Sequence, residues 1–220
     1  GDRLTDIEAQ REILLNVEAE RASAVLLSAG GNDLFEDGRI ADLIEDPFPG
    51  AQVEDLVGET FDVFLEDMAG RYLALFNRIH TAFPRVHILI HGYGPAFPKG
   101  GSWIETPLTG VGVPPATQHD IIVRLVERFN AMLSDIAALP ELGGMVAHIN
   151  IMDIGTDRGD WHDEIHLNGP NAARVADRFR DELKRRLDTP VGESGIAPRR
   201  ARDGLQEAVA RQATTLSAFD

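Results

Sequence analysis

The stretch Ser23-Ala-Val-Leu-Leu-Ser-Ala-Gly-Gly-Asn-Asp33 points to the fold class, because a short apolar run stops at a glycine-rich turn. We interpret residues 23–29 as a buried strand. Two later runs have the same character, at residues 86–91 (Val-His-Ile-Leu-Ile-His) and 145–151 (Met-Val-Ala-His-Ile-Asn-Ile). Nearly continuous apolar runs of this length are typical of parallel strands that are covered on both faces.

Amphipathic helical patterns alternate with these strands. Apolar residues recur at helical spacing over residues 4–17, 53–83, 122–136 and 172–187. Gly58 and Gly70 are candidate breaks in the second pattern, and Asn168-Gly169-Pro170 favours a helix start before the last one. The alternation predicts an α/β fold, a three-layer αβα sandwich around a parallel sheet. Three strands make a thin sheet for so much helix, so we expect further strands upstream of Gly1.

The sequence predicts one large domain followed by a short linker and a tail. Its 220 residues are 43% apolar, which suits one domain with a sizeable core, and we assign residues 1–188 to it. Residues 189–202 are predicted to be a linker and residues 203–220 a helical tail. Within the domain, residues 36–52 and 96–115 are rich in glycine and proline and are predicted to be loops.

Composition excludes several classes of function. The net charge of −15 disfavours binding to nucleic acids or to anionic membrane surfaces. No apolar run reaches the roughly 18 residues of a transmembrane helix. The absence of cysteine removes disulfides, thiolate metal sites and a cysteine nucleophile.

Two segments that follow predicted strands carry candidate chemistry, since sites in parallel sheets lie where strands end. The first is Gly30-Gly31-Asn32-Asp33, in which the Asn32 amide is able to donate a hydrogen bond to a developing oxyanion. An ordinary turn is the competing interpretation. The second segment contains Asp163 and His166, and an aspartate three residues before a histidine is able to fix one imidazole nitrogen and leave the other free as a base. A solvated acidic loop, or a helix cap, would use the same residues.

A metal site is a further alternative in the second segment. His162 and His166 have the i, i+4 spacing of a zinc-binding helix, with Asp160 and Asp163 beside them. That pattern requires a helix, whereas the expected helix starts only after His166. We therefore rank a metal-dependent hydrolase below a metal-free one.

Taken together, the two segments resemble the SGNH (GDSL-type) hydrolase family. The resemblance implies that Asn32 and Gly31 belong to the block that supplies the oxyanion donor, and that Asp163 and His166 are the last two members of a Ser-His-Asp triad. It assigns Gly1 as a backbone oxyanion donor. The function implied is hydrolysis of a small-molecule ester by a serine nucleophile, with neither a metal nor an organic cofactor.

The family's Gly-Asp-Ser block is absent from the 220 residues. Residues 1–3 do not replace it, because no strand precedes them and too few residues separate them from the Asn32 turn. Ser23 and Ser28 are assigned to the buried strand, and Ser194 has no strand before it. We therefore expect the nucleophile upstream of Gly1 and the 220 residues alone to be inactive. A non-catalytic binding module with this fold is the alternative.

Other residues are predicted to shape the site. His91 and Tyr93 follow the second strand and are candidates for the wall of an acyl pocket, although a purely structural role is equally compatible with the pattern. Trp161 lies beside the Asp163–His166 segment and either covers the site or packs in the core. The apolar residues of the 96–115 loop are candidates for the same pocket.

Overall fold

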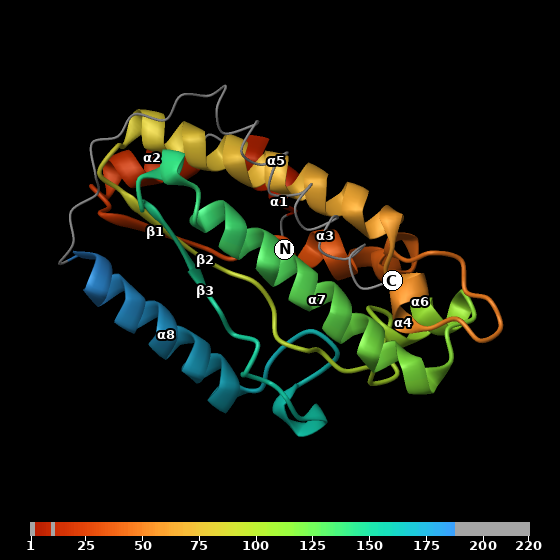
Figure 1. The fold of residues 1–220 in the computed structure, drawn as a ribbon. Coiled ribbons are helices and arrows are strands. Elements are labelled where there is room, and N and C mark those ends of the chain that lie inside the picture. Colours follow the sequence, from red (N-terminus) through yellow and green to blue (C-terminus); the bar gives the residue numbers. More distant parts are fainter. Residues whose placement is uncertain (1–2, 10–11, 188–220) are drawn as a thin grey trace.

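A computed structural model of the chain describes residues 3–9 and 12–187. Helices and strands alternate along most of this range (Figure 1). The β-strands are β1 (Ala24–Leu27), β2 (His87–His91) and β3 (Val146–Ile149). The helices are α1 (Leu4–Ala9), α2 (Glu12–Ala19), α3 (Gly31–Phe35), α4 (Val53–Leu56), α5 (Glu59–Ala82), α6 (Glu105–Gly110), α7 (Pro115–Ala137) and α8 (Gly169–Leu187), with 3₁₀ turns at Glu36–Leu43, Pro140–Leu142 and Arg158–Asp160.

The three strands form one parallel sheet in the order β1-β2-β3. The strands pair residue for residue: Leu27 of β1 pairs with Ile90 of β2, and Ile90 pairs with His148 of β3. The carboxyl ends of all three strands therefore reach the same edge of the sheet. In a parallel sheet this edge is where the following segments are able to build a site.

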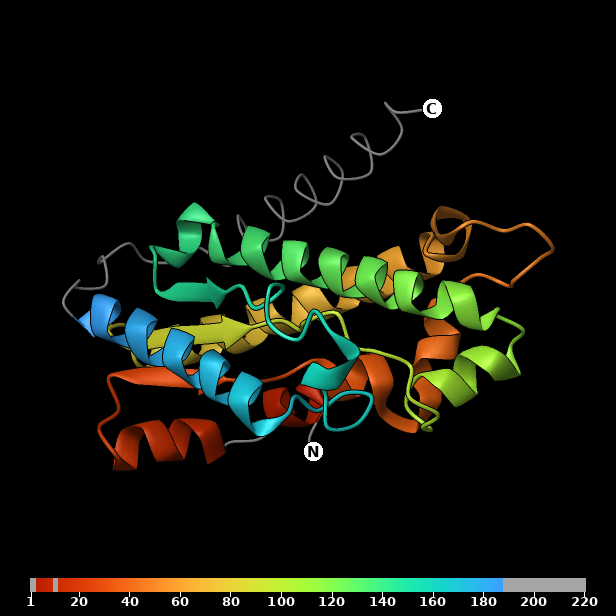
Figure 2. The same ribbon diagram turned by 90° about the horizontal axis from the view of Figure 1, so that it is seen from below.

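Helices cover both faces of the sheet (Figures 1 and 2). On one face, Leu89 and Ala147 pack with Val175 and Phe179 of α8. On the other face, Ile88 and the neighbouring strand residues join the large core formed with α5 and α7. Successive strand residues point to opposite faces, and both faces are mostly apolar. The exceptions are His87 and His91, on the Leu89 side of β2, and His148, whose register partner is Ile90. The arrangement of helices and sheet confirms the predicted α/β class with a parallel sheet, and the layering is consistent with an SGNH- or flavodoxin-like fold.

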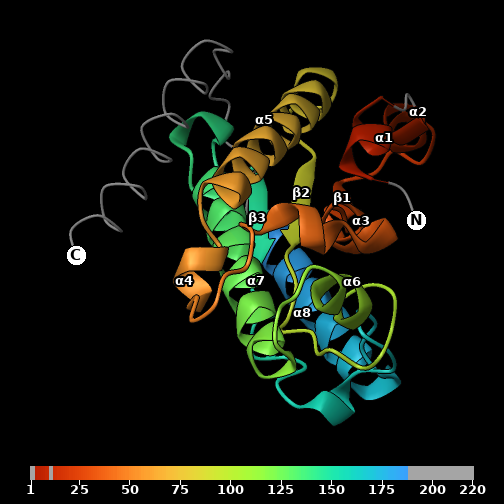
Figure 3. The same ribbon diagram turned by 90° about the vertical axis from the view of Figure 1, so that its right-hand side faces the viewer.

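The edge strand β1 is covered less completely than its neighbours. Helix α8 packs over β2 and β3, and the Leu26 side chain of β1 is 54% exposed although its register partner Leu89 is 0% exposed. Figure 3 shows α1 and α2 beside β1, and α1 packs against α5. The N–H of Leu4 donates to the buried Asp33 carboxylate at 2.8 Å and so ties α1 to α3.

Several local predictions need correction. Gly58 does separate α4 from α5, but Gly70 lies within α5 and breaks nothing. The loop predicted at 96–115 contains α6, and the loop at 36–52 contains a 3₁₀ turn at Glu36–Leu43, because one or two turns of helix give too little periodicity to recognise. The predicted linker (189–202) and tail (203–220) lie outside the described residues. No helix within 3–9 and 12–187 is long and apolar enough to cross a membrane.

Because α8 covers β2 but not β1, truncating the paired residues Leu89 and Leu26 should lower the free energy of unfolding by different amounts. Leu89→Ala is expected to lower the free energy of unfolding by about 2–5 kcal/mol, since it leaves a cavity beneath α8. Leu26→Ala, at the partner position on β1, is expected to cost less than about 1 kcal/mol because that side chain is already half in water. Urea unfolding of both variants checks this. Equal costs would contradict the placement of α8.

Candidate active site

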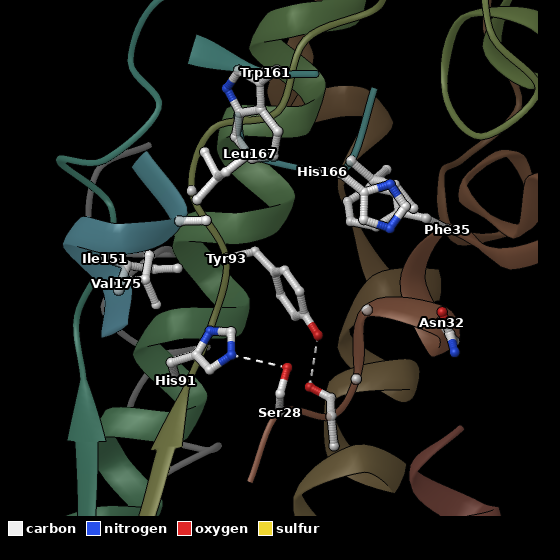
Figure 4. Close-up of a pocket in the computed structure, with 16 residues that line it drawn as sticks. Ser28, Asn32, Phe35, His91, Tyr93, Ile151, Trp161, His166, Leu167 and Val175 are labelled. Atoms are coloured by element: carbon white, nitrogen blue, oxygen red, sulfur yellow. Dashed lines mark hydrogen bonds between the residues drawn. The ribbon is translucent and has the colours of Figure 1, made fainter. Parts of the chain in front are cut away.

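A pocket of about 490 Å³ opens at the carboxyl edge of the sheet (Figure 4). Its walls come from the ends of β1 and β2, from α3, from the segment between β3 and α8, and from α8 itself. The volume lies within the range of small-molecule sites. The polar or aromatic side chains that line it are those of Ser28, Asn32, Phe35, His91, Tyr93, Trp161 and His166.

Asp163 and His166 form a hydrogen-bonded pair at one end of this pocket. His166 Nδ1 lies 2.8 Å from Oδ2 of Asp163 and 3.0 Å from its Oδ1. The backbone N–H groups of Ile165 and His166 also donate to Asp163 Oδ1, at 2.9 and 2.8 Å. Since a carboxylate accepts only, Nδ1 carries a proton, and in the neutral ring Nε2 is then the proton acceptor.

The charge state of Asp163 supports this assignment. Partial burial acts to raise the pKa of the carboxyl group. The hydrogen bonds from the Ile165 N–H and from the ring and N–H of His166 outweigh burial, and the pKa lies below its ordinary value. Asp163 is thus ionised at neutral pH, and its negative charge favours the imidazolium that forms when Nε2 accepts a proton. Both side chains are reached by solvent, with 64% of His166 and 42% of Asp163 exposed.

Asn32 lines the same pocket from the short helix α3. The chain enters α3 through Gly30 in a left-handed conformation (φ 90°), and a Cβ on Gly30 would lie only 2.5 Å from the Phe129 ring. Glycine is required there for both reasons. The next residue, Asp33, turns inward to the Leu4 N–H, whereas Asn32 sits at the pocket wall, with its amide on the side of α3 away from Ser28 in Figure 4.

Tyr93 stands between the two ends of the pocket (Figure 4). Its hydroxyl donates to the carbonyl oxygen of Ala29 at 2.9 Å, and the buried Tyr72 donates to the same oxygen at 2.9 Å. Burial raises the pKa of Tyr93, only partly offset by the Gly31 N–H and the Ser28 hydroxyl. A Cβ on Gly31 would lie 2.6 Å from the Tyr93 hydroxyl, so glycine is needed here as well.

Ser28 and His91 meet at the other end of the pocket, which corrects the prediction that Ser28 lies in a buried strand. Strand β1 ends at Leu27, and Ser28 is the first residue beyond it, exposed and in the pocket wall. Its Oγ lies 2.9 Å from Nε2 of His91. The strand register accounts for this contact: Leu27 pairs with Ile90, Ser28 follows Leu27, and His91 follows Ile90.

Glu164 is a key residue of the site region that the sequence did not reveal. Its side chain is 1% exposed and accepts four backbone N–H groups, three from the loop before α6 and one from the first residue of α6, at 2.9–3.1 Å. It therefore fastens that loop to the segment that carries Asp163 and His166. Its partners lie about sixty residues away and are backbone groups, so no local motif marks it. The donors belong to Lys99, Trp103, Ile104 and Glu105.

The structure brings most of the sequence-predicted site residues together. Asn32, Gly31, His91, Tyr93 and His166 line one pocket, and Asp163 supports His166 from behind. Trp161 lines the pocket too and is buried, with its Nε1–H donating to the Gly155 carbonyl at 2.7 Å. Gly1 lies outside the described residues. No cluster of three or more potential metal ligands occurs in the described ranges, so the metal alternative lacks a ligand set there.

Comparisons with known proteins give a fold likeness only. No protein-family model matches the sequence, and no curated protein matches it. Among solved structures, a carbohydrate esterase family 3 protein from Talaromyces cellulolyticus is similar, with a TM-score of 0.47 and 13% identity. The similarity covers 86% of this chain and 70% of that one. Likeness of this degree says nothing about the chemistry of the pocket.

The role of Glu164 predicts a marked loss of stability on a nearly isosteric change. Glu164→Gln replaces one accepting oxygen by an NH₂ group that faces backbone donors, which leaves buried N–H groups without an acceptor. We expect the free energy of unfolding to fall by about 2–4 kcal/mol. Glu127→Gln, on the exposed face of α7, is the matched control and should stay within about 0.5 kcal/mol. Similar urea midpoints for the two variants would show that the hydrogen bonds accepted by Glu164 contribute nothing to stability.

His148, behind the pocket, predicts a pH dependence of stability. Its Nε2 lies 3.3 Å from Oδ1 of Asn130, whose Nδ2 donates to the Tyr93 carbonyl. Burial first, and then the charge of His91, lower the pKa of His148 from 6.5 to about 4. The folded chain thus keeps this ring neutral while the unfolded chain protonates, so stability is full above pH 6.5 and falls as the pH drops toward 4.

The expected loss from His148 between pH 7.5 and 5 is about 1 kcal/mol after allowance for partial exposure of the ring. Urea unfolding at the two pH values measures it. His148→Gln should remove this part of the pH dependence, whereas His162→Gln, on the exposed loop, should leave it unchanged. A pH dependence that is the same in all three proteins would contradict the assignment.

Proposed function

We propose that this protein hydrolyses carboxylic esters in the pocket at the carboxyl edge of the sheet. The observation that carries the proposal is the Asp163–His166 hydrogen bond of 2.8 Å, in a pocket that Asn32 also lines. An orienting carboxylate, an imidazole with a free Nε2 and an amide donor are three of the groups that acyl transfer by a hydroxyl nucleophile requires.

The roles are assigned from the chemistry of each group. His166 Nε2 moves protons at the ester, accepting one from attacking oxygen and giving one to the leaving alcohol. Asp163 holds the imidazole in the tautomer with the proton on Nδ1 and stabilises the imidazolium while it exists. The Asn32 amide is assigned to the negative oxygen of the tetrahedral intermediate, a role in which one donor is typically worth about 2.7–4 kcal/mol.

The lining of the pocket favours a small, uncharged ester. Phe35, Ile151, Leu167 and Val175 supply apolar wall, and the described residues of the lining include no lysine or arginine. The chain as a whole has a net charge of −15, which repels anionic substrates. We therefore expect short acyl chains on neutral alcohols to be better substrates than esters that carry a carboxylate or phosphate.

His166→Ala tests the proposal. Removing a triad histidine typically costs three orders of magnitude or more, so hydrolysis of a short-chain aryl ester should fall at least ~10³-fold in kcat/KM. The matched control is His162→Ala, a neighbouring exposed histidine that does not line the pocket. It should keep near-full activity.

Two results would overturn the proposal. One is full activity of His166→Ala. The other is a folded wild-type protein that turns over no ester but binds a small ligand in this pocket, which would make it a binding module instead.

A further inference from the structure

We propose that Ser28 Oγ is the hydroxyl that takes up the acyl group, with His91 as its base. This deepens the proposed ester hydrolysis and rests on it for the choice of reaction. It names a nucleophile among the described residues, as an alternative to the one that the family resemblance leads us to expect upstream of Gly1.

The tautomer of His91 is set by its two neighbours. Nδ1 lies 2.5 Å from the carbonyl oxygen of Gly92, which accepts only, so Nδ1 carries the proton. Nε2 is then an acceptor, and the Ser28 hydroxyl, 2.9 Å away, donates to it. A serine hydroxyl that donates to an unprotonated imidazole, whose other nitrogen is held by a fixed acceptor, has the arrangement of an activated nucleophile.

The surroundings keep the His91 ring in place and neutral. Phe179 of α8 contacts it edge-on with ring centroids 5.4 Å apart, and Tyr93 contacts it at 5.8 Å. Burial lowers the pKa of His91, and the hydrogen bond to the Gly92 carbonyl offsets this in part. The ring is thus unprotonated at neutral pH and able to accept the serine proton.

Ser28 is accessible to a substrate as well as paired. It is exposed and lines the same pocket as His166 and Asn32, with the Tyr93 ring between it and His166 (Figure 4). Its hydroxyl faces His91 because both residues continue the Leu27–Ile90 register, and residues in register on neighbouring strands point to the same face. The sheet itself therefore builds this pair.

The reaction divides the proton transfers between the two histidines. Ser28 Oγ forms a bond to the ester carbonyl carbon while its proton moves to His91 Nε2. The tetrahedral intermediate collapses, the bond from carbon to the alcohol oxygen breaks, and that oxygen leaves with the electron pair and the proton held by His91. Water then attacks the acyl carbon while His166 takes one proton of the water and later passes it to solvent. The bond from the acyl carbon to Ser28 Oγ breaks, the acid leaves as the carboxylate, and its proton returns to Ser28 Oγ through His91.

Covalent labelling of the full 220-residue chain tests the inference directly. An alkyl fluorophosphonate forms an Oγ–P bond and releases fluoride, with the serine proton passing through His91 to solvent. We expect one label per chain, on the tryptic peptide of residues 22–39, which contains Ser23 and Ser28. Fragmentation of that peptide assigns the label between the two serines.

Labelling of single variants distinguishes the role of Ser28 as nucleophile from that of His91 as base. Ser28→Ala should abolish the label, and Ser23→Ala, at the exposed residue just before β1, should leave it unchanged. His91→Gln should slow labelling about 10²-fold, the scale of general-base loss. His166→Ala should still be labelled at Ser28 while ester turnover is lost.

Because the chain has no cysteine, Ser28→Cys gives a second measurement that does not depend on the probe. Its thiol should react with iodoacetamide at pH 7 about tenfold faster than the thiol of Ser23→Cys, and adding His91→Gln should remove the difference. Equal rates in the two single variants would overturn the pairing.

Three labelling results would also overturn the inference: no label on a chain with wild-type circular dichroism, a label on another hydroxyl, or loss of label in His166→Ala but not in His91→Gln. Each leaves the proposed function standing if His166→Ala still abolishes ester turnover. Conversely, labelling of Ser28 with unchanged turnover by His166→Ala would reject the role of His166 and keep that of Ser28.

Discussion

The pocket depends on the register in which the three parallel strands pair. Leu27, Ile90 and His148 pair across the three strands, so the residues that follow emerge side by side at one edge. Ser28 and His91 meet for this reason, and the turn into α3 brings Asn32 to the same edge. A one-residue slip in β1 would turn Ser28 to the opposite face and separate it from His91.

The other half of the pocket depends on a folded loop instead of on the sheet. Between β3 and α8, the Asp163 carboxylate accepts hydrogen bonds from two backbone N–H groups and from the His166 ring. The neighbouring Glu164 accepts four backbone N–H groups from residues 99–105. Two adjacent carboxylates thus have different tasks. Asp163 lies behind His166 and orients this base, whereas the buried Glu164 holds two loops together.

Much of the fold could be predicted from periodicity, because α5, α7, α8 and the three strands are long or apolar enough to show it. The short helices α3 and α6 could not, since a single turn carries no period. The Asp163–His166 pair could be predicted because its hydrogen bonds are local in sequence. The Ser28–His91 contact requires the strand register, and Glu164 binds backbone groups about sixty residues away from it, so neither contact leaves a local pattern.

A crystal structure of the protein with a short-chain alkylphosphonate, which imitates the tetrahedral intermediate, tests the central claim most directly. The account predicts that the analogue occupies this pocket, with a phosphonyl oxygen about 2.7–3.2 Å from the Asn32 amide nitrogen and another oxygen within the same reach of His166 Nε2. An analogue bound elsewhere, or bound in the pocket with both side chains turned away from it, would contradict the account.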